Sequence, residues 1–472
     1  MPLLMIPTQK PLHRNRFVRN MVWLGICLAL GCSSKPSIPI PDPTSKVENA
    51  IMDGNSENSS RFNEPESVDS RAERLKRDAD RLRFLRAPHL LEIELPDFAG
   101  AHAIWGATGT DHFNRIYFGA AGYGVDDPSA HLLRYDPSTG KSVDLGGINS
   151  VLTRLGIRRT IDYDETQMKI HSKIFQAADG NVYFSSQDEH DEKGDGSGNA
   201  RFGGRLFALD PRNDQWTCIL TAPEGLIAAA CERRHVYAMG YFGNVIYRYD
   251  TKTKETRSIK LGTMGGHVSR NIFVDANEHL FAARLTPGSS INDPGTTRVG
   301  TSLVRSTLVE LDPELEIVHE WPLEDYAPTL DTDSHGITGF CRLSGGDIVF
   351  ITHSGAIWLL KSDVVGDQRL QRLGWMHHEG PAYVASLFSP LGERFVGGFV
   401  QTNGAYEWVI YDIEQRASTR LRLAQQDQRI LETPGLLLYG CDTLDRNANA
   451  YVVGWKRIPR GYGPIAIRME WK

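Results

Sequence analysis

Histidines recur at a nearly constant distance before a series of predicted turns. The interval is eight residues in two cases and nine in two others. The four pairs of histidine and turn residue are His171 with Asp179, His267 with Asp275, His102 with Asp111, and His335 with Ser344. Histidine transfers protons near neutral pH and also binds metal ions. A repeated spacing therefore predicts that these side chains gather at one place, although each one could instead hydrogen-bond a neighbouring element.

A second set of polar residues closes the strands that follow these turns. Gln187, Tyr241 and His353 each lie four residues past a bulky strand residue, and His190 follows Gln187 closely. Arg270 lies three residues into its strand, where other copies have glycine, so we expect its guanidinium to project inward.

The elements that carry these residues belong to an internal repeat over residues 89–472. Each unit has an inner apolar strand a, a polar turn, a strand b, a strand c that ends near aspartate, and an outer strand d. One copy reads SKIFQAADGNVYFSS, followed by GGRLFALDPRNDQWTCI. The chain holds seven a–b pairs but only six complete c–d pairs.

The missing outer strand indicates how the repeat closes. The last copy ends in PIAIRMEWK, which supplies strand c, and HLLEIEL at 89–95 can supply strand d. Such an exchange closes a ring and removes its open edges. We therefore predict an all-β fold, a seven-bladed β-propeller closed by an N-terminal strand and preceded by a short helix. One repeat unit fewer or more would give six or eight blades. Two separate β-sandwiches fit the repeat poorly.

In such a ring, the start of strand a and the end of strand b meet at one end of the central channel. Four long connections fall at this end too, over 188–203, 285–300, 147–170 and 324–334. Long loops gathered on one face of a regular scaffold usually carry its function. The sequence thus predicts a polar site at the channel mouth.

The N-terminus predicts export. Residues 1–31 have a basic start and a short apolar core, and Gly31 precedes Cys32. ALGCSS resembles the lipobox of bacterial lipoproteins, which implies lipidation at Cys32 and a membrane anchor, in the periplasm or at the cell surface. A plain secretory signal or a short anchor is the alternative. Residues 32–68 have the composition of a disordered tether, and residues 69–88 form an amphipathic helix.

The net charge limits the kinds of partner that the protein can bind. Loss of a leader with four basic and no acidic residues lowers the formal charge from −6 to about −10, which argues against nucleic acid. An anionic ligand could still bind in a local basic pocket, and we expect a monomer.

Cys218 and Cys231 are the one pair of cysteines that lie close together in the sequence. They could form a disulfide or remain free thiols.

Histidine, tyrosine and arginine together suit β-elimination on a uronic-acid glycan, because the reaction neutralises a carboxylate and moves two protons. Here the chain resembles the seven-bladed propeller polysaccharide lyases of the ulvan lyase and oligogalacturonate lyase type. The matching stretches are KIHSKIFQAADGNVYFSS, VYAMGYFGNVIYRYDTKTKETR and GHVSR. The resemblance implies an anionic polysaccharide or oligosaccharide as substrate.

Residue roles follow from that resemblance. His171, Tyr241 and Arg270 would be catalytic, with His171 or Tyr241 removing the C5 proton and Arg270 holding the carboxylate. Substrate-binding roles fall to Gln187, His190, His267, His335 and His353, with Arg257 in reserve because the repeat puts it near an outer strand.

Three other uses of the mouth stay open. The histidines could hold a divalent metal ion (Ca, Mn or Zn). The propeller could bind a glycan or a protein without catalysis. A lactonase-like or streptogramin-lyase-like enzyme is the third, disfavoured because most acidic residues fall in turns. The acidic stretch DEHDEKGDGSG lacks the spacing of a calcium-binding loop.

Overall fold

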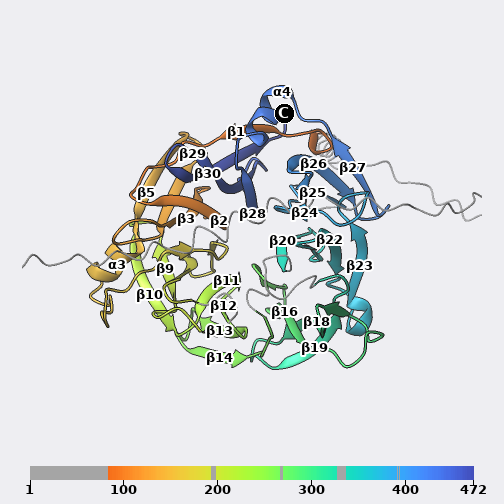
Figure 1. Ribbon diagram of the computed structural model, residues 1–472, viewed down its shortest axis with the longest axis horizontal. Coiled ribbons are helices and arrows are strands. Elements are labelled where there is room, and N and C mark those ends of the chain that lie inside the picture. The colour runs from red at the N-terminus through yellow and green to blue at the C-terminus, as the bar shows by residue number, and fades with distance from the viewer. Residues whose placement is uncertain (1–82, 193–197, 266–268, 327–335, 391, 393) are drawn as a thin grey trace, which may run out of the picture. The chain divides into compact units, whose positions relative to one another are not determined.

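The computed structural model describes residues 83–192, 198–265, 269–326, 336–390, 392 and 394–472. Its strands form seven antiparallel sheets that follow one another around a common axis, as the colour order in Figure 1 shows. The predicted seven-bladed β-propeller is confirmed.

Blades 1 to 3 come from the first half of the ring, each listed from the axis outward. Blade 1 contains β2 (Ala101–Thr110), β3 (Ile116–Gly122), β4 (His131–Asp136) and β5 (Lys141–Gly147). Blade 2 contains β6 (Lys169–Ile170) with β7 (Phe175–Gln176), then β8 (Val182–Gln187), β9 (Gly204–Asp210) and β10 (Gln215–Ala222). Blade 3 contains β11 (Gly225–Glu232), β12 (His235–Tyr241), β13 (Val245–Asp250) and β14 (Thr256–Lys260).

Blades 4 to 6 continue the pattern. Blade 4 contains β15 (Phe273–Val274), β16 (Leu280–Pro287), β18 (Ser302–Leu311) and β19 (Ile317–Pro322), with β17 (Thr296–Val299) paired to the start of β18. Blade 5 contains β20 (Ile337–Arg342), β21 (Ile348–Thr352), β22 (Ala356–Leu360) and β23 (Leu370–Trp375). Blade 6 contains β24 (Tyr383–Val384), β25 (Phe395–Thr402), β26 (Ala405–Asp412) and β27 (Ala417–Leu421).

Blade 7 closes the ring with both ends of the described chain. It contains β28 (Leu437–Leu444), β29 (Ala450–Ile458), β30 (Gly461–Glu470) and, as its outer strand, β1 (His89–Glu92). His89 pairs with Glu470 and Glu92 with Ile467. The predicted strand exchange is therefore confirmed, and it covers the edge that β30 would otherwise expose.

Short helices lie in the connections between strands: α3 (Ile148–Arg154), α4 (Gln425–Leu431) and the 3-10 turn η2 (Gly366–Arg369). The predicted helix at 69–88 falls largely outside the described residues, but Phe84 near its end is buried against Trp471, with ring centroids 5.3 Å apart. No helix among the described residues has the length and apolar character that crossing a membrane requires. The signal-peptide, tether and Cys32 predictions fall outside the described residues.

A repeated side-chain turn explains the spacing seen in the sequence. In blade 1, Asp111 Oδ1 accepts from the backbone N–H groups of Phe113 and Arg115, at 2.9 and 3.0 Å, and its Oδ2 accepts from the Tyr117 hydroxyl at 2.8 Å. Blades 2 and 7 repeat this bond between Tyr183 and Asp179 (2.8 Å) and between Tyr451 and Asp445 (2.9 Å). The bulky strand-b residue thus ties the a–b turn to the sheet.

The blades pack through apolar side chains on both faces of each sheet. Between blades 3 and 4, for example, Tyr237 and Met239 belong to one buried cluster with Leu280 and Val309. Each sheet therefore has hydrophobic residues on both of its faces, because a neighbouring blade packs against each face.

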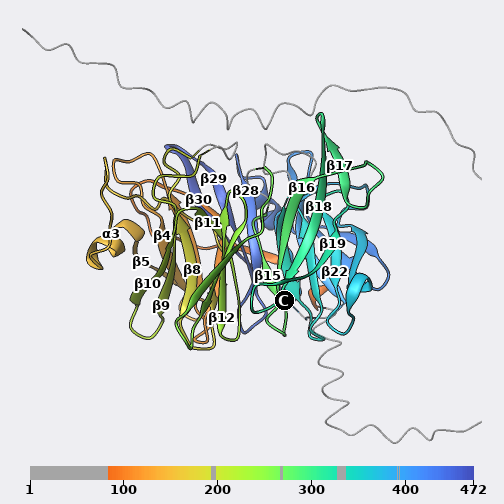
Figure 2. The ribbon, with the colours of Figure 1, turned by 90° about the horizontal axis from the view of Figure 1, so that it is seen from below.

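The two ends of the ring differ in their connections (Figure 2). We call the end at which strand a begins and strand b ends the mouth face, and the end with the a–b turns the turn face. The β17–β18 hairpin is the b–c connection of blade 4 and extends beyond the neighbouring strands on one side of the ring in Figure 2. The predicted loop over 285–300 therefore contains a strand, β17.

Cys218 lies in β10 and Cys231 in β11, and both are free cysteines. Of the two alternatives left by the sequence, the structure has free thiols.

Candidate functional site

Blade 2 brings the first of the predicted residues together. β6 pairs with the end of β8, so that Lys169 lies opposite Gln187 and Ile170 opposite Ser186. His171 follows β6 directly, and the inner strand resumes only at β7. His171 and Gln187 therefore lie at the same end of blade 2, where antiparallel pairing was expected to place them.

Gln187 and Tyr241 join blades 2 and 3 at the mouth face. Gln187 is fully buried, and its Nε2 donates to the Tyr241 hydroxyl at 3.1 Å. Tyr241 is 1% exposed and donates its own proton to Glu192 Oε2 at 2.5 Å. Because that proton is engaged by Glu192, the phenol oxygen accepts from Gln187, which fixes the orientation of the amide.

Glu189 is the centre of the same network. Its carboxylate accepts from the Tyr123 hydroxyl of blade 1 at 2.5 Å and from Lys169 Nζ at 3.0 Å. Gln187 Nε2 also lies 3.3 Å from Glu189 Oε1. Lys169 in turn lies over the ring of Trp105, 4.3 Å from its centroid. Side chains of blades 1, 2 and 3 thus form one connected polar cluster.

The cluster holds its tyrosines protonated. Burial raises the pKa of Tyr241 well above its ordinary value, and the nearby Glu192 and Glu189 carboxylates raise it further. Burial and Glu189 raise the pKa of Tyr123 in the same way. Both phenols are therefore hydrogen-bond donors at neutral pH. Burial lowers the pKa of His102, against the opposing effect of Glu189, and favours the neutral imidazole.

His171 is 5% exposed, and its Nδ1 lies 3.0 Å from the carbonyl oxygen of Ile227 in β11. A carbonyl oxygen only accepts, so Nδ1 carries the proton in the neutral ring. Nε2 is then the basic atom of His171.

Arg270 projects toward the ring axis, as its sequence position predicted. Its guanidinium carbon lies 4.6 Å from the ring centroid of Tyr439, which belongs to the inner strand of blade 7. Blades 4 and 7 are not neighbours in the ring, so this contact crosses the axis (Figure 1). Lys173 of blade 2 crosses it too, with Nζ 4.5 Å from the Phe340 centroid of blade 5 and an ion pair to Asp442 of blade 7.

His190 lies at the rim of the cluster. Its Nδ1 is 3.0 Å from Thr166 Oγ1 and 3.6 Å from Asp188 Oδ1, and its side chain is partly exposed. The hydrogen-bonding and charge of Asp188 raise the pKa of His190, against the effect of burial.

Two of the remaining predicted residues contact other parts of the ring. Arg257 lies on β14, the outermost strand of blade 3, and forms an ion pair with Glu314. His353 follows β21 of blade 5 and contacts the Tyr383 ring, with centroids 4.8 Å apart. His267 and His335, and with them the predicted metal site of the mouth histidines, lie outside the described residues.

Sequence reasoning missed the members that hold the cluster together. Lys169, Glu189 and Glu192 carry no motif, and each lies one or two residues from a predicted position. Tyr123 directly follows β3, and this position after strand b is the signal that could have found it.

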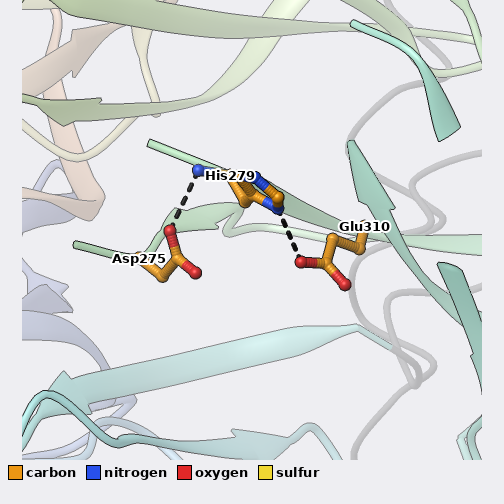
Figure 3. Close-up of side chains that lie close together, drawn as sticks. All are labelled: Asp275, His279 and Glu310. Carbon is orange, nitrogen blue, oxygen red and sulfur yellow. Dashed lines mark hydrogen bonds and ion pairs between the residues drawn. The ribbon is translucent and has the colours of Figure 1, made fainter. Parts of the chain in front are cut away.

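One group among the described residues has three potential metal ligands within 4.8 Å of one another: Asp275, His279 and Glu310 (Figure 3). It lies at the turn face. His279 Nδ1 is 2.7 Å from Glu310 Oε1, and Asp275 Oδ1 accepts from the His279 backbone N–H at 3.0 Å. Arg369 already binds both carboxylates, at 2.6 Å to Asp275 and 2.5 Å to Glu310.

This group is a variant of the repeated turn. In blade 4 the strand-b residue is Phe281, which has no hydroxyl for the Asp275 carboxylate. Arg369 supplies the missing donor and lies over the Phe281 ring, 5.1 Å from its centroid. A cation would have to displace this guanidinium, so we assign the group a structural role.

The fold and this cluster define a seven-bladed β-propeller with a polar site at one end of its axis. No family model and no curated protein matches the sequence. Among solved structures, U3-55K is 12% identical, with a TM-score of 0.46 over 80% of this chain and 98% of that one. The Cps50 (Swd1) β-propeller domain of Myceliophteria thermophila is also 12% identical, with a TM-score of 0.46 over 80% and 99% of the two chains.

An oligogalacturonate lyase from Vibrio parahaemolyticus is 10% identical, with a TM-score of 0.43 over 82% of this chain and 98% of that one. Likenesses this low concern the propeller fold and carry no argument about activity.

Proposed function

We propose that the protein is a polysaccharide lyase that cleaves uronic-acid glycans by β-elimination at the mouth face. The observation that supports this proposal is the division of hydrogen-bonding roles between two neighbouring blades. Tyr241 is held as a protonated phenol by burial and by Glu192, whereas the Nδ1 proton of His171 faces the Ile227 carbonyl, which makes Nε2 the ring nitrogen that would take up a proton.

This division assigns the two proton transfers. A phenol whose pKa is raised well above the ordinary value donates a proton but does not abstract one. His171 Nε2 is therefore the base that takes the C5 proton of the uronate. Electrons of the C5–H bond form the C4–C5 double bond, and the C4–O bond breaks. Tyr241 gives its proton to the departing glycosidic oxygen, and both residues return to their starting states by exchange with water.

Arg270 is the cation for the substrate carboxylate. It projects to the axis at the mouth face, where its planar guanidinium matches a carboxylate in a bidentate geometry. Neutralising that carboxylate stabilises the negative charge that develops next to it when the C5 proton leaves.

Access requires a local rearrangement. Because Tyr241 and His171 are buried, the substrate has to replace Glu192 as the acceptor of the Tyr241 proton. We expect the glycosidic oxygen to take the place of Glu192 Oε2, which makes Glu192 the residue that holds the phenol in position before the substrate arrives.

The same burial favours a second candidate, a propeller that binds glycan without cleaving it. In that case Tyr241 and His171 hold the blades together, and ligand contacts only the partly exposed groups around them. Export and a lipid anchor at Cys32 are proposed for either function.

The test is an elimination assay on a panel of uronic-acid polysaccharides, in which the unsaturated product is followed by its ultraviolet absorbance. We expect product with the wild type, and a loss of at least about a hundredfold for His171→Ala and Tyr241→Phe. Tyr247→Phe is the matched control, because Tyr247 also donates to a glutamate, Glu224 at 2.7 Å, but from the third strand of blade 3. Absence of product on every polymer would favour the binding function, and full activity of Tyr241→Phe would overturn the mechanism.

A further inference from the structure

A series of aromatic rings runs across the mouth face beside the polar cluster. Its centre is formed by Trp105 of β2 with Tyr439 and Trp455 of blade 7. The ring centroids of Trp105 and Trp455 are 4.4 Å apart, those of Tyr439 and Trp455 are 5.3 Å apart, and those of Trp105 and Tyr439 are 5.6 Å apart. Blades 1 and 7 therefore share one aromatic cluster.

The series extends in both directions from this centre. On one side, Trp455 lies 6.5 Å from Tyr462, and Tyr462 lies 5.9 Å from His102. On the other side, Tyr439 lies 6.4 Å from Tyr383, which contacts His353. We call the full set the aromatic band: His102, Tyr462, Trp455, Trp105, Tyr439, Tyr383 and His353.

Strand register places the band at the mouth face. Trp455 lies toward the end of β29, opposite Leu437, the first residue of β28. Tyr462 is the second residue of β30, directly after the b–c turn, and pairs with Arg457. Trp105 falls where the β2 register slips between Ile104 and Thr108, and such a bulge redirects a side chain away from the regular alternation.

The band has a buried floor and an exposed rim. Trp105 and Tyr439 are buried, while Trp455, His102, Tyr383 and His353 are partly exposed and Tyr462 is 43% exposed. Aromatic rings that served packing alone would be covered by other side chains. A rim of this kind offers the faces and edges of aromatic rings to a ligand, with polar atoms beside them.

Two charged side chains pack against the buried rings of the aromatic band. Lys169 lies over Trp105 and Arg270 over Tyr439, so two cations hold the rings in place. Through Lys169 and Glu189 the band is continuous with the polar cluster. His102 also lies 5.1 Å from Tyr123, ring to ring, which is the second link between the two.

We propose that the aromatic band is a binding platform for a pyranose chain, on which sugar rings stack across blades 1, 7, 6 and 5 next to the polar cluster. This inference rests on the proposed function in taking a glycan as the ligand, and it deepens that function by naming where the chain lies. The apolar C–H face of a pyranose packs on an aromatic ring, and its hydroxyl groups then reach the polar edge.

The side-chain contacts that cross the axis determine the path of the bound glycan chain. Lys173 reaches Phe340 and Asp442, and Arg270 reaches Tyr439, so side chains of opposite blades meet inside the ring. A polymer therefore lies across the mouth face and does not pass along the axis. The band presents several aromatic rings in series, so affinity should rise with chain length.

The test measures binding separately from cleavage, by titration calorimetry and tryptophan fluorescence with polygalacturonate, alginate and a neutral β-glucan. Tyr462→Ala is the main variant, because an exposed side chain can be removed without harm to folding. We expect wild type to bind at least one polymer, and Tyr462→Ala to weaken that binding roughly three- to tenfold. Trp455→Phe should keep most of the affinity and lose part of the fluorescence change.

Phe113→Ala is the matched control, since Phe113 is 48% exposed but lies in an a–b turn on the turn face. If Tyr462→Ala binds every polymer as Phe113→Ala does, the platform is refuted, as it is if the wild type binds none of them. Binding that Tyr462→Ala weakens, in a protein that forms no unsaturated product, would support the platform while the proposed lyase activity fails. Tyr241→Phe should block cleavage and leave this binding in place.

Discussion

The Tyr241 hydroxyl lies 2.5 Å from Glu192 Oε2 and donates its proton to that carboxylate. The contact orders the whole mouth cluster. It turns the phenol oxygen into an acceptor for Gln187, whose amide also reaches Glu189. It also opposes ionisation of the phenol, because a phenolate would face a carboxylate at hydrogen-bond distance in a buried site.

Tyr241 should therefore remain un-ionised at a pH where ordinary tyrosines are half ionised, about pH 10. The measurement is an ultraviolet titration of phenolate absorbance in wild type and Tyr241→Phe. The two curves should coincide up to pH 10, because the missing residue contributes no phenolate there. Loss of one tyrosine equivalent from the variant curve near pH 10 would contradict this assignment. Glu192→Gln should lower the pKa of Tyr241 but leave it above the ordinary value, since burial is the larger cause.

His190 should titrate above the ordinary histidine pKa of about 6.5, because its hydrogen bond and charge interaction with Asp188 favour the protonated ring. A raised folded-state pKa stabilises the fold below the ordinary pKa, and this contribution disappears as the pH rises through the raised value. The His190 ring protons can be followed by NMR across this range. Asp188→Asn should return the midpoint toward the ordinary value, and an unchanged midpoint would show that Asp188 is not the cause.

Arg369→Met should destabilise the protein by about 3–5 kcal/mol, because it leaves Asp275 and Glu310 buried without their cation. The free energy of unfolding can be measured with urea. In the variant, added Zn²⁺ should recover part of the loss, since Asp275, His279 and Glu310 then face a vacant position. Arg212→Ala is the control, because Arg212 pairs with Asp210 at the exposed surface. Equal stability of the two variants would refute the structural role of Arg369.

Asp427→Ala should loosen the closing strand. Asp427 Oδ1 accepts from His89 Nδ1 at 2.7 Å and from the Leu90 backbone N–H at 2.9 Å, and it is buried. Loss of both bonds should cost about 1–3 kcal/mol and should speed proteolysis near β1. Asp367→Ala removes a comparable aspartate–histidine pair, with His319 at 3.1 Å, but at the surface, where an effect below about 1 kcal/mol is expected. If the closing strand were as protease-resistant in Asp427→Ala as in wild type, this anchor would carry no stability.

The ring could be predicted because its unit is local. In blades 1, 2 and 7 the a–b turn combines an aspartate with a tyrosine four to six positions later, as in Asp179 with Tyr183 and Asp111 with Tyr117. A spacing this short can be recognised in the sequence. The number of its copies indicates that one outer strand is missing, which β1 supplies. Arg369 shows the limit of that reasoning. It replaces a tyrosine hydroxyl in blade 4 from a position 94 residues away from Asp275.

By itself, the sequence determined the seven repeated units, the exchange of β1 into blade 7 and the end of the ring at which polar residues gather. These follow from strand alternation and short turns, which depend on neighbours along the chain. Only the tertiary structure decided which of those residues meet. Glu189 joins Tyr123 to Lys169, Glu192 holds the Tyr241 proton, and Trp105 packs on Trp455 across the junction between the first and last blades. Contacts between blades depend on the closed ring, so no local period in the sequence records them.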